Sequence, residues 1–129
     1  MQKTRLLLAT IAGFSFLSFA ALADVGNPLI GKWVEKFANG ASMQTEFTTT
    51  SISSTPMDAA GKPSGSTITA QVTYKNLGHN EKMGDGYSID FVTPDGKPAG
   101  PGIMGYLKTP DALELDFPSA STHNLKRVK

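Results

Sequence analysis

The chain of 129 residues contains no cysteine. This absence excludes disulfide bonds, thiolate catalysis, iron–sulfur clusters and cysteine-based zinc sites. Neither sign of charge is in excess, with 12 lysines and arginines beside 11 aspartates and glutamates. That balance argues against a nucleic-acid partner, because proteins that bind nucleic acids normally carry a basic patch. With 40% hydrophobic residues the chain does not have a disordered composition, and its length suits a single domain.

The longest apolar stretch lies at the N-terminus, within residues 1–23, and has the pattern of a secretory signal peptide. Lys3 and Arg5 precede this stretch, and a small-x-small cleavage site ends it at Ala23. The apolar part is shorter than the roughly 20 residues that a membrane-spanning helix needs. We therefore predict that residues 1–23 are cleaved on export of the unfolded chain. Residues 24–129 then form one domain in the bacterial periplasm or outside the cell, without being embedded in the membrane.

Beyond the predicted signal peptide, no segment keeps the apolar period of an amphipathic helix, and apolar residues alternate with polar ones instead. In the segment 66–75, for example, Ile68 and Val72 fall on one face and threonines fall on the other. The same alternation occurs in 87–91 and in 113–117. Strands with one apolar and one polar face are typical of antiparallel sheets. The sequence therefore predicts an all-β domain with these apolar faces turned inward.

Turn sequences divide the domain into seven or eight strands, the number depending on whether the threonine-rich stretch 42–53 bends into two. An Asn-Gly pair at 39–40 is typical of a hairpin turn, and the segment 94–97 has the Pro-Asp-Gly pattern of another turn. Longer loops are expected at 56–65 and 76–86. Hairpins at this spacing predict a small antiparallel up-and-down barrel or a sandwich, and a barrel requires the first strand to lie beside the last.

The two ends of the domain carry a further pattern. Gly31 and Trp33 stand at the start of the first predicted strand, and Arg127 stands in the last. A Gly-x-Trp opening with a late arginine resembles the lipocalin-like and wider calycin barrels. The resemblance implies that Trp33 closes one end of the barrel and that Arg127 packs over its ring, while Gly31 allows close approach of the chain. The alternative is that Trp33 is an ordinary core residue and Arg127 a solvated charge.

The chain departs from that family in four respects. It is much shorter than a full lipocalin, it lacks a helix after the barrel, and it lacks the family's usual disulfides. A second lipocalin motif in the middle of the chain is also missing. The resemblance therefore covers the whole domain as a pattern only, and it does not imply a large ligand cavity.

No arrangement of residues typical of catalysis is evident, and we expect a protein that is not an enzyme and has no cofactor. Glu114 and Asp116 alternate with leucines and should face solvent, where they are of little use for acid catalysis. His79 and Met83 are weak candidates for metal ligands, although a solvated polar loop is the more ordinary interpretation. His123 leads into the last strand and is expected at the surface.

The inner face of the predicted barrel is the remaining candidate site. A barrel of about eight strands is just wide enough to be filled by side chains or to hold one small ligand, and the sequence leaves both outcomes open. Tyrosine hydroxyls need a partner when buried, and a ligand cavity is one way to supply it. The residues that we expect to contact a ligand are Met43, Phe47, Tyr74, Tyr87 and Phe91.

Three functions are compatible with these patterns, the third being metal or stress buffering through His79 and Met83. The first hypothesis is an exported, non-enzymatic, lipocalin-like protein that binds a small apolar or amphipathic molecule in the barrel. The alternative is a protein-interaction module, such as an inhibitor of periplasmic hydrolases, that acts through its loops. The loops 56–65 and 94–102 would then make the contacts, because loops on a rigid scaffold often carry recognition.

Overall fold

The structure, a computed structural model, describes residues 26–119 and 121–129. The predicted signal peptide, 1–23, lies outside the described residues. Nowhere in the described part is there a helix long and apolar enough to cross a membrane. That part consists of eight strands joined by turns and loops: β2 (Gly31–Lys36), β3 (Ser42–Phe47), β4 (Ser51–Met57), β5 (Ile68–Asn80), β6 (Gly84–Phe91), β7 (Ile103–Thr109), β8 (Ala112–Asp116) and β9 (Thr122–Arg127).

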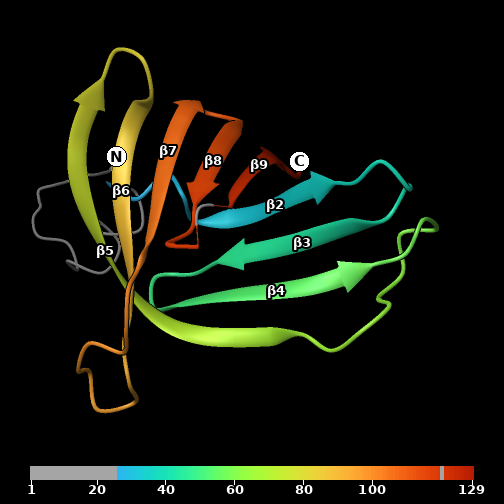
Figure 1. Cartoon of the computed structure of the whole chain (residues 1–129), viewed down its shortest axis with the longest axis horizontal. Helices are drawn as coiled ribbons and strands as arrows, with labels where there is room; N and C mark the ends of the chain where they lie inside the picture. Colours follow the sequence, from blue (N-terminus) through green and yellow to red (C-terminus); the bar gives the residue numbers. More distant parts are fainter. Residues whose placement is uncertain (1–25, 120) are drawn as a thin grey trace, which may run out of the picture.

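The eight described strands form one closed antiparallel barrel. Each strand pairs with the next along the chain, and β2 also pairs with β9 (Figure 1). The closing ladder places Trp33 opposite Arg127 and Val34 opposite Lys126. Closure removes the unpaired edges that an open sheet would expose. The predicted all-β fold, the up-and-down barrel and the pairing of its first and last strands are therefore confirmed.

The threonine-rich stretch bends into two strands, which settles the number of strands at the higher of the two predicted values. The bend lies between Phe47 and Ser51, where the Thr48 N–H donates to the Ser51 carbonyl over 2.9 Å. The Thr48 hydroxyl also lies 2.7 Å from that of Ser51. These local bonds satisfy the backbone of the tight connection, so the chain reverses without a longer loop.

The long loop predicted at 76–86 is wrong. Strand β5 continues to Asn80 and β6 begins at Gly84, so only a short turn joins them. The Asn80 side-chain carbonyl accepts bonds from the N–H groups of Lys82 and Met83, over 2.8 and 3.0 Å. Gly84 has a φ of +89°, and the Leu107 carbonyl leaves no room for a Cβ there. Polar composition indicated a loop, whereas these residues form an exposed hairpin.

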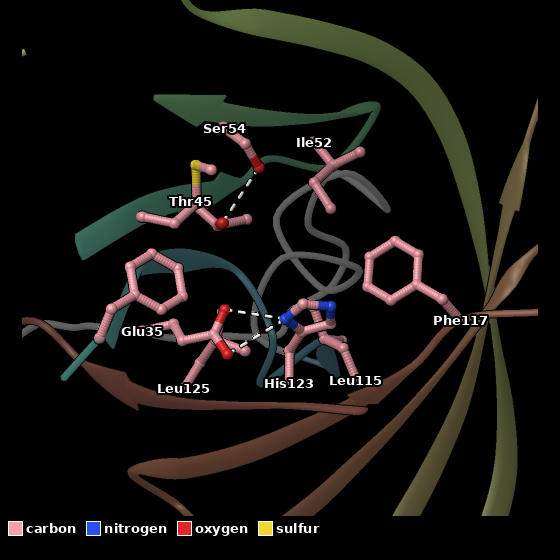
Figure 2. Close-up of a pocket in the computed structure, with 10 residues that line it drawn as sticks. Glu35, Thr45, Ile52, Ser54, Leu115, Phe117, His123 and Leu125 are labelled. Atoms are coloured by element: carbon pink, nitrogen blue, oxygen red, sulfur yellow. Dashed lines mark hydrogen bonds and ion pairs between the residues drawn. The ribbon is translucent and has the colours of Figure 1, made fainter. Parts of the chain in front are cut away.

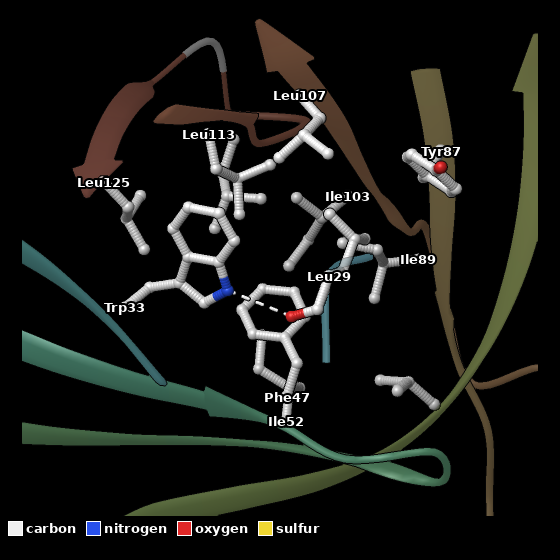
Figure 3. Close-up of a cluster of buried hydrophobic side chains, with 12 residues drawn as sticks. Leu29, Trp33, Phe47, Ile52, Tyr87, Ile89, Ile103, Leu107, Leu113 and Leu125 are labelled. Carbon is white, nitrogen blue, oxygen red and sulfur yellow. Dashed lines mark hydrogen bonds between the residues drawn. The ribbon is translucent and has the colours of Figure 1, made fainter. Parts of the chain in front are cut away.

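The apolar core fills the part of the barrel around Trp33 (Figure 3). Its members come from every described strand and from the segment that precedes β2. The largest fully buried side chains are Trp33, Phe47, Leu29, Ile89, Ile103 and Leu113. A barrel of this size is filled by side chains over most of its interior, as the small-barrel geometry allows.

Ile68 is the exception to the predicted inward face of β5, because it is 74% exposed. The β5–β6 ladder ends at the pair Val72–Phe91, and the β4–β5 ladder ends at Ser54–Ile68. Ile68 thus has a neighbouring strand on one side only. Alternation correctly placed Ile68 on the inward side of β5, but at this position no strand on the other side of the barrel covers it.

Candidate functional site

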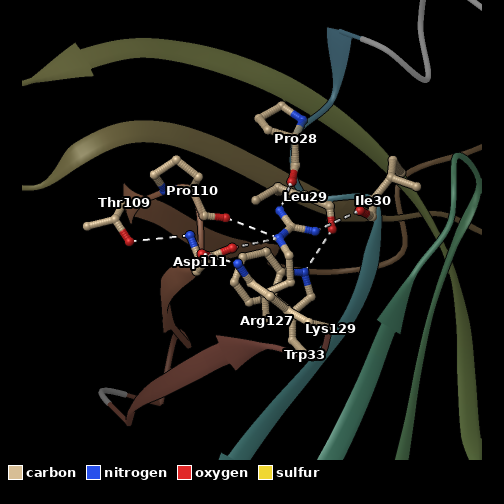
Figure 4. A network of polar contacts seen from close by, with 9 residues as sticks. All are labelled: Pro28, Leu29, Ile30, Trp33, Thr109, Pro110, Asp111, Arg127 and Lys129. Carbon is tan, nitrogen blue, oxygen red and sulfur yellow. Dashed lines mark hydrogen bonds and ion pairs between the residues drawn. The ribbon is translucent and has the colours of Figure 1, made fainter.

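One end of the barrel, which we call the closed end, is formed around Trp33. Its indole is fully buried, and its Nε1–H donates to the Leu29 carbonyl over 3.0 Å. The guanidinium carbon of Arg127 lies 4.3 Å from the centre of the Trp33 ring (Figure 4). Gly31 has a φ of +132°, and a Cβ there would lie 3.0 Å from the Arg127 Nη1. The structure thus brings Gly31, Trp33 and Arg127 together.

Arg127 also connects separate segments of the chain by hydrogen bonds. Its Nη2 and Nη1 donate to the carbonyls of Pro28 and Ile30, over 2.6 and 3.2 Å. Its Nε donates to the Pro110 carbonyl over 3.1 Å and lies 3.5 Å from the Asp111 carboxylate. The planar guanidinium therefore joins the segment before β2 to the β7–β8 turn while it covers the indole.

Farther along β2 from Trp33, the interior is not filled, and a cavity of about 190 Å³ remains there (Figure 2). We call it the mouth cavity. Most of its lining is apolar. These side chains come from β3, β4, β8 and β9 and from the residues that directly follow β2 and β8: Phe37, Met43, Ile52, Leu115, Phe117 and Leu125. Four polar side chains complete the lining: Glu35, Thr45, Ser54 and His123.

Glu35 and His123 form a hydrogen-bonded pair inside the mouth cavity. The His123 Nδ1 lies 2.9 and 3.1 Å from the two carboxylate oxygens of Glu35, and the side chains are 36% and 18% exposed, respectively. The ring of Phe117 meets the His123 ring edge to face, with centroids 5.1 Å apart. Because a carboxylate accepts, Nδ1 carries a proton in this pair, and in the neutral ring Nε2 is then an acceptor.

The second polar feature of the mouth cavity is a pair of hydroxyls. Thr45 Oγ1 and Ser54 Oγ lie 3.1 Å apart on the neighbouring strands β3 and β4. Thr45 is buried, so this bond satisfies a hydroxyl that would otherwise be costly inside the barrel. The lining of the mouth cavity therefore offers apolar contacts and two polar pairs, Glu35–His123 and Thr45–Ser54.

The five predicted ligand contacts do not lie together. Met43 lines the mouth cavity, Phe47 is buried in the core, and Phe91 packs against that core while partly buried. Tyr74 and Tyr87 border another hollow, which lies beside residues 26 and 27 and the β3–β4 turn. Alternation identified inner faces but not the level at which each side chain lies along the barrel.

The sequence interpretation missed Glu35 and misplaced His123. His123 is on the inner face of β9 and lines the mouth cavity, so the expectation of a surface position is wrong. The alternation of side chains along a strand could have shown that both face inward, because Glu35 is two residues from Trp33 and His123 is two residues from the buried Leu125. An ionisable group at an inward position of a barrel strand needs a partner.

The two weak metal candidates lie near the β5–β6 turn. The His79 Nδ1 is 2.8 Å from a carboxylate oxygen of Asp85, and both side chains are more than half exposed. Met83 belongs to the turn itself. Across the residues that the structure describes, no group of three or more histidine, cysteine or acidic side chains is suited to hold a metal ion.

Tyr74 gives a prediction on alkaline stability. Its hydroxyl donates to the Thr48 carbonyl over 2.6 Å, and burial raises its pKa from 10.0 to about 12. The folded state therefore holds this proton more tightly than the unfolded state does, so stability present below pH 10 is lost between about pH 10 and pH 12. Tyr74→Phe should flatten this decline in urea unfolding followed at several pH values. Equal declines for Tyr74→Phe and the unaltered protein would contradict the assignment.

No protein family, curated protein or solved structure matches this chain. The fold of the chain is therefore the basis for describing what class of protein it is. In the described residues that architecture is an eight-stranded, closed antiparallel barrel, compatible with a calycin-like barrel. One end is closed by an indole under a guanidinium, and a small, mainly apolar cavity lies toward the other.

Proposed function

We propose that this chain is an exported, non-enzymatic, lipocalin-like protein that binds a small apolar or amphipathic molecule in the mouth cavity. The observation that carries the proposal is the cavity itself, because it interrupts an interior that is otherwise filled by side chains. An apolar lining with a few convergent polar groups is the usual composition of a small-molecule site. The signal-peptide pattern in residues 1–23 supports export.

The size of the mouth cavity limits the ligand. Its volume of about 190 Å³ lies below the roughly 300–1,000 Å³ of sites that enclose drug-sized ligands. Trp33 and Phe47 occupy the interior beyond it, so a long molecule cannot extend toward the closed end. We therefore propose a ligand about the size of a single ring with a short side chain.

Filling the mouth cavity should abolish binding. Ser54→Leu adds apolar volume inside the cavity, whereas Ser53→Leu makes the same change on the outer face of β4. Each substitution also removes one hydroxyl–hydroxyl bond, so the two variants are matched. Native mass spectrometry of protein from its own host should show a bound small molecule that Ser53→Leu retains and Ser54→Leu loses. Absence of any bound mass, together with no saturable binding of small neutral aromatic compounds, would contradict the proposal.

A hydrolase inhibitor is the second candidate, and the exposed apolar residues favour it. Ile68 and Phe37 are 74% and 41% exposed, and Ile68 adjoins the long β4–β5 connection. An inhibitor would bind through these exposed residues and through the β6–β7 loop. Its capture of an enzyme from a periplasmic extract should therefore be weakened by Ile68→Ser, which removes an exposed apolar side chain.

A further inference from the structure

The charged groups in the mouth cavity indicate which head group its ligand has. This inference rests on the proposed function. Among the described residues that line the cavity, the ionisable ones are Glu35 and His123, and no lysine or arginine joins them. Their net charge is zero when His123 is protonated and −1 when it is neutral, as long as Glu35 is ionised. The lining is therefore neutral or negative, never positive.

This charge distribution separates possible ligands by their head groups. A carboxylate ligand would leave an unbalanced negative charge even beside protonated His123, and such a charge is costly in a partly buried site. An ammonium ligand would leave no net charge, because it balances Glu35 while His123 is neutral.

The aromatic residues of the mouth cavity favour the same head group. Phe37 and Phe117 both line it, and Phe117 lies against the His123 ring. The face of an aromatic ring attracts a cation and gives an anion no comparable attraction. The carboxylate of Glu35 and the two phenyl rings thus line one small space, where the apolar part of a ligand would contact Leu115 and Leu125.

We propose that the ligand of the mouth cavity is a small apolar amine. Its ammonium group donates to the carboxylate of Glu35, inside the cavity that Phe37 and Phe117 also line. Its apolar part packs on the leucines of β8 and β9. The same arrangement discriminates against fatty acids and other apolar carboxylates of similar size.

Three probes that share one tail test the head group. Phenylethylamine, phenylethanol and phenylpropanoate are titrated into the protein by isothermal calorimetry at neutral pH. The amine should bind about tenfold or more tightly than the carboxylate, with the neutral alcohol between them. Equal affinity for the amine and the carboxylate, or preference for the carboxylate, would overturn the proposal.

Two variants assign the preference to the pair. Glu35→Gln should lower the affinity for phenylethylamine about tenfold and leave that for phenylethanol unchanged. Glu46→Gln is the matched control, because Glu46 is exposed on the outer face of the neighbouring β3. His123→Gln frees the Glu35 carboxylate and should preserve the preference for the amine, so it carries the test even where Glu35→Gln fails to fold.

The outcomes also separate this inference from the proposed function. Saturable binding of phenylethanol without a preference for the amine would overturn the head-group assignment and leave the small-molecule function standing. An amine affinity that Glu35→Gln and Glu46→Gln alter equally would likewise overturn the assignment. Absence of binding by all three probes to folded protein would contradict both.

Discussion

Replacing Trp33 with alanine is expected to lower the free energy of unfolding by about 3–5 kcal/mol. The indole is fully buried, and its removal would leave a void at the closed end and deprive Arg127 of the ring beneath it. Urea unfolding followed by far-UV circular dichroism measures the loss, since Trp33 is the sole tryptophan and fluorescence disappears with it.

Two further variants serve as controls for the Trp33→Ala measurement. Phe37→Ala removes another large aromatic side chain, but one that is 41% exposed, and should cost less than about 1 kcal/mol. Trp33→Phe keeps an aromatic ring and should fall between the two, which preserves a measurement where the alanine variant is too unstable to fold. Similar losses for Trp33→Ala and Phe37→Ala would show that the indole does not organise the closed end.

Replacing Arg127 with alanine is expected to cost about 3 kcal/mol of stability, because hydrogen bonds from a charged donor are the strong ones. The substitution leaves the carbonyls of Pro28, Ile30 and Pro110 without this donor and uncovers the Trp33 ring. Chemical denaturation of the variant and of the unaltered protein, under the same conditions, measures the difference.

Lysine should not replace Arg127 effectively. A single ammonium group lacks the planar arrangement of donors that reaches three carbonyls and covers an indole, so Arg127→Lys should recover less than about half of the loss. Lys126→Ala, on the exposed side of the same strand, should change stability by no more than about 0.5 kcal/mol. Full rescue by lysine would mean that Arg127 acts through its charge alone.

The sequence predicted the fold well because its main signal is local. Alternation shows which residues of a strand share a face, and the Asn-Gly pair at 39–40 marks a hairpin. The residues at the two ends, Trp33 and Arg127, also pointed to the partners that meet when the barrel closes. Where the prediction failed, as at 76–86, the polar composition of an exposed hairpin resembled that of a loop.

The mouth cavity could not be predicted in the same way. Glu35 and His123 are 88 residues apart in the chain and become neighbours only when the first and last strands pair. Alternation placed Met43 and Phe47 on one face, yet the first lines the cavity and the second is in the core. The difference is their level along the barrel, which depends on the stagger of all strands together.

The ladder between β2 and β9 has a consequence for the order of folding. Trp33 pairs with Arg127, so the contacts that complete the cylinder join residues from opposite ends of the domain. Closing a loop of this length costs more conformational entropy than closing any one of the hairpins. A nascent chain that has not yet emerged as far as Arg127 therefore stays an open, incomplete sheet. For a protein that we propose is exported unfolded, the barrel therefore cannot close before its last strand is made.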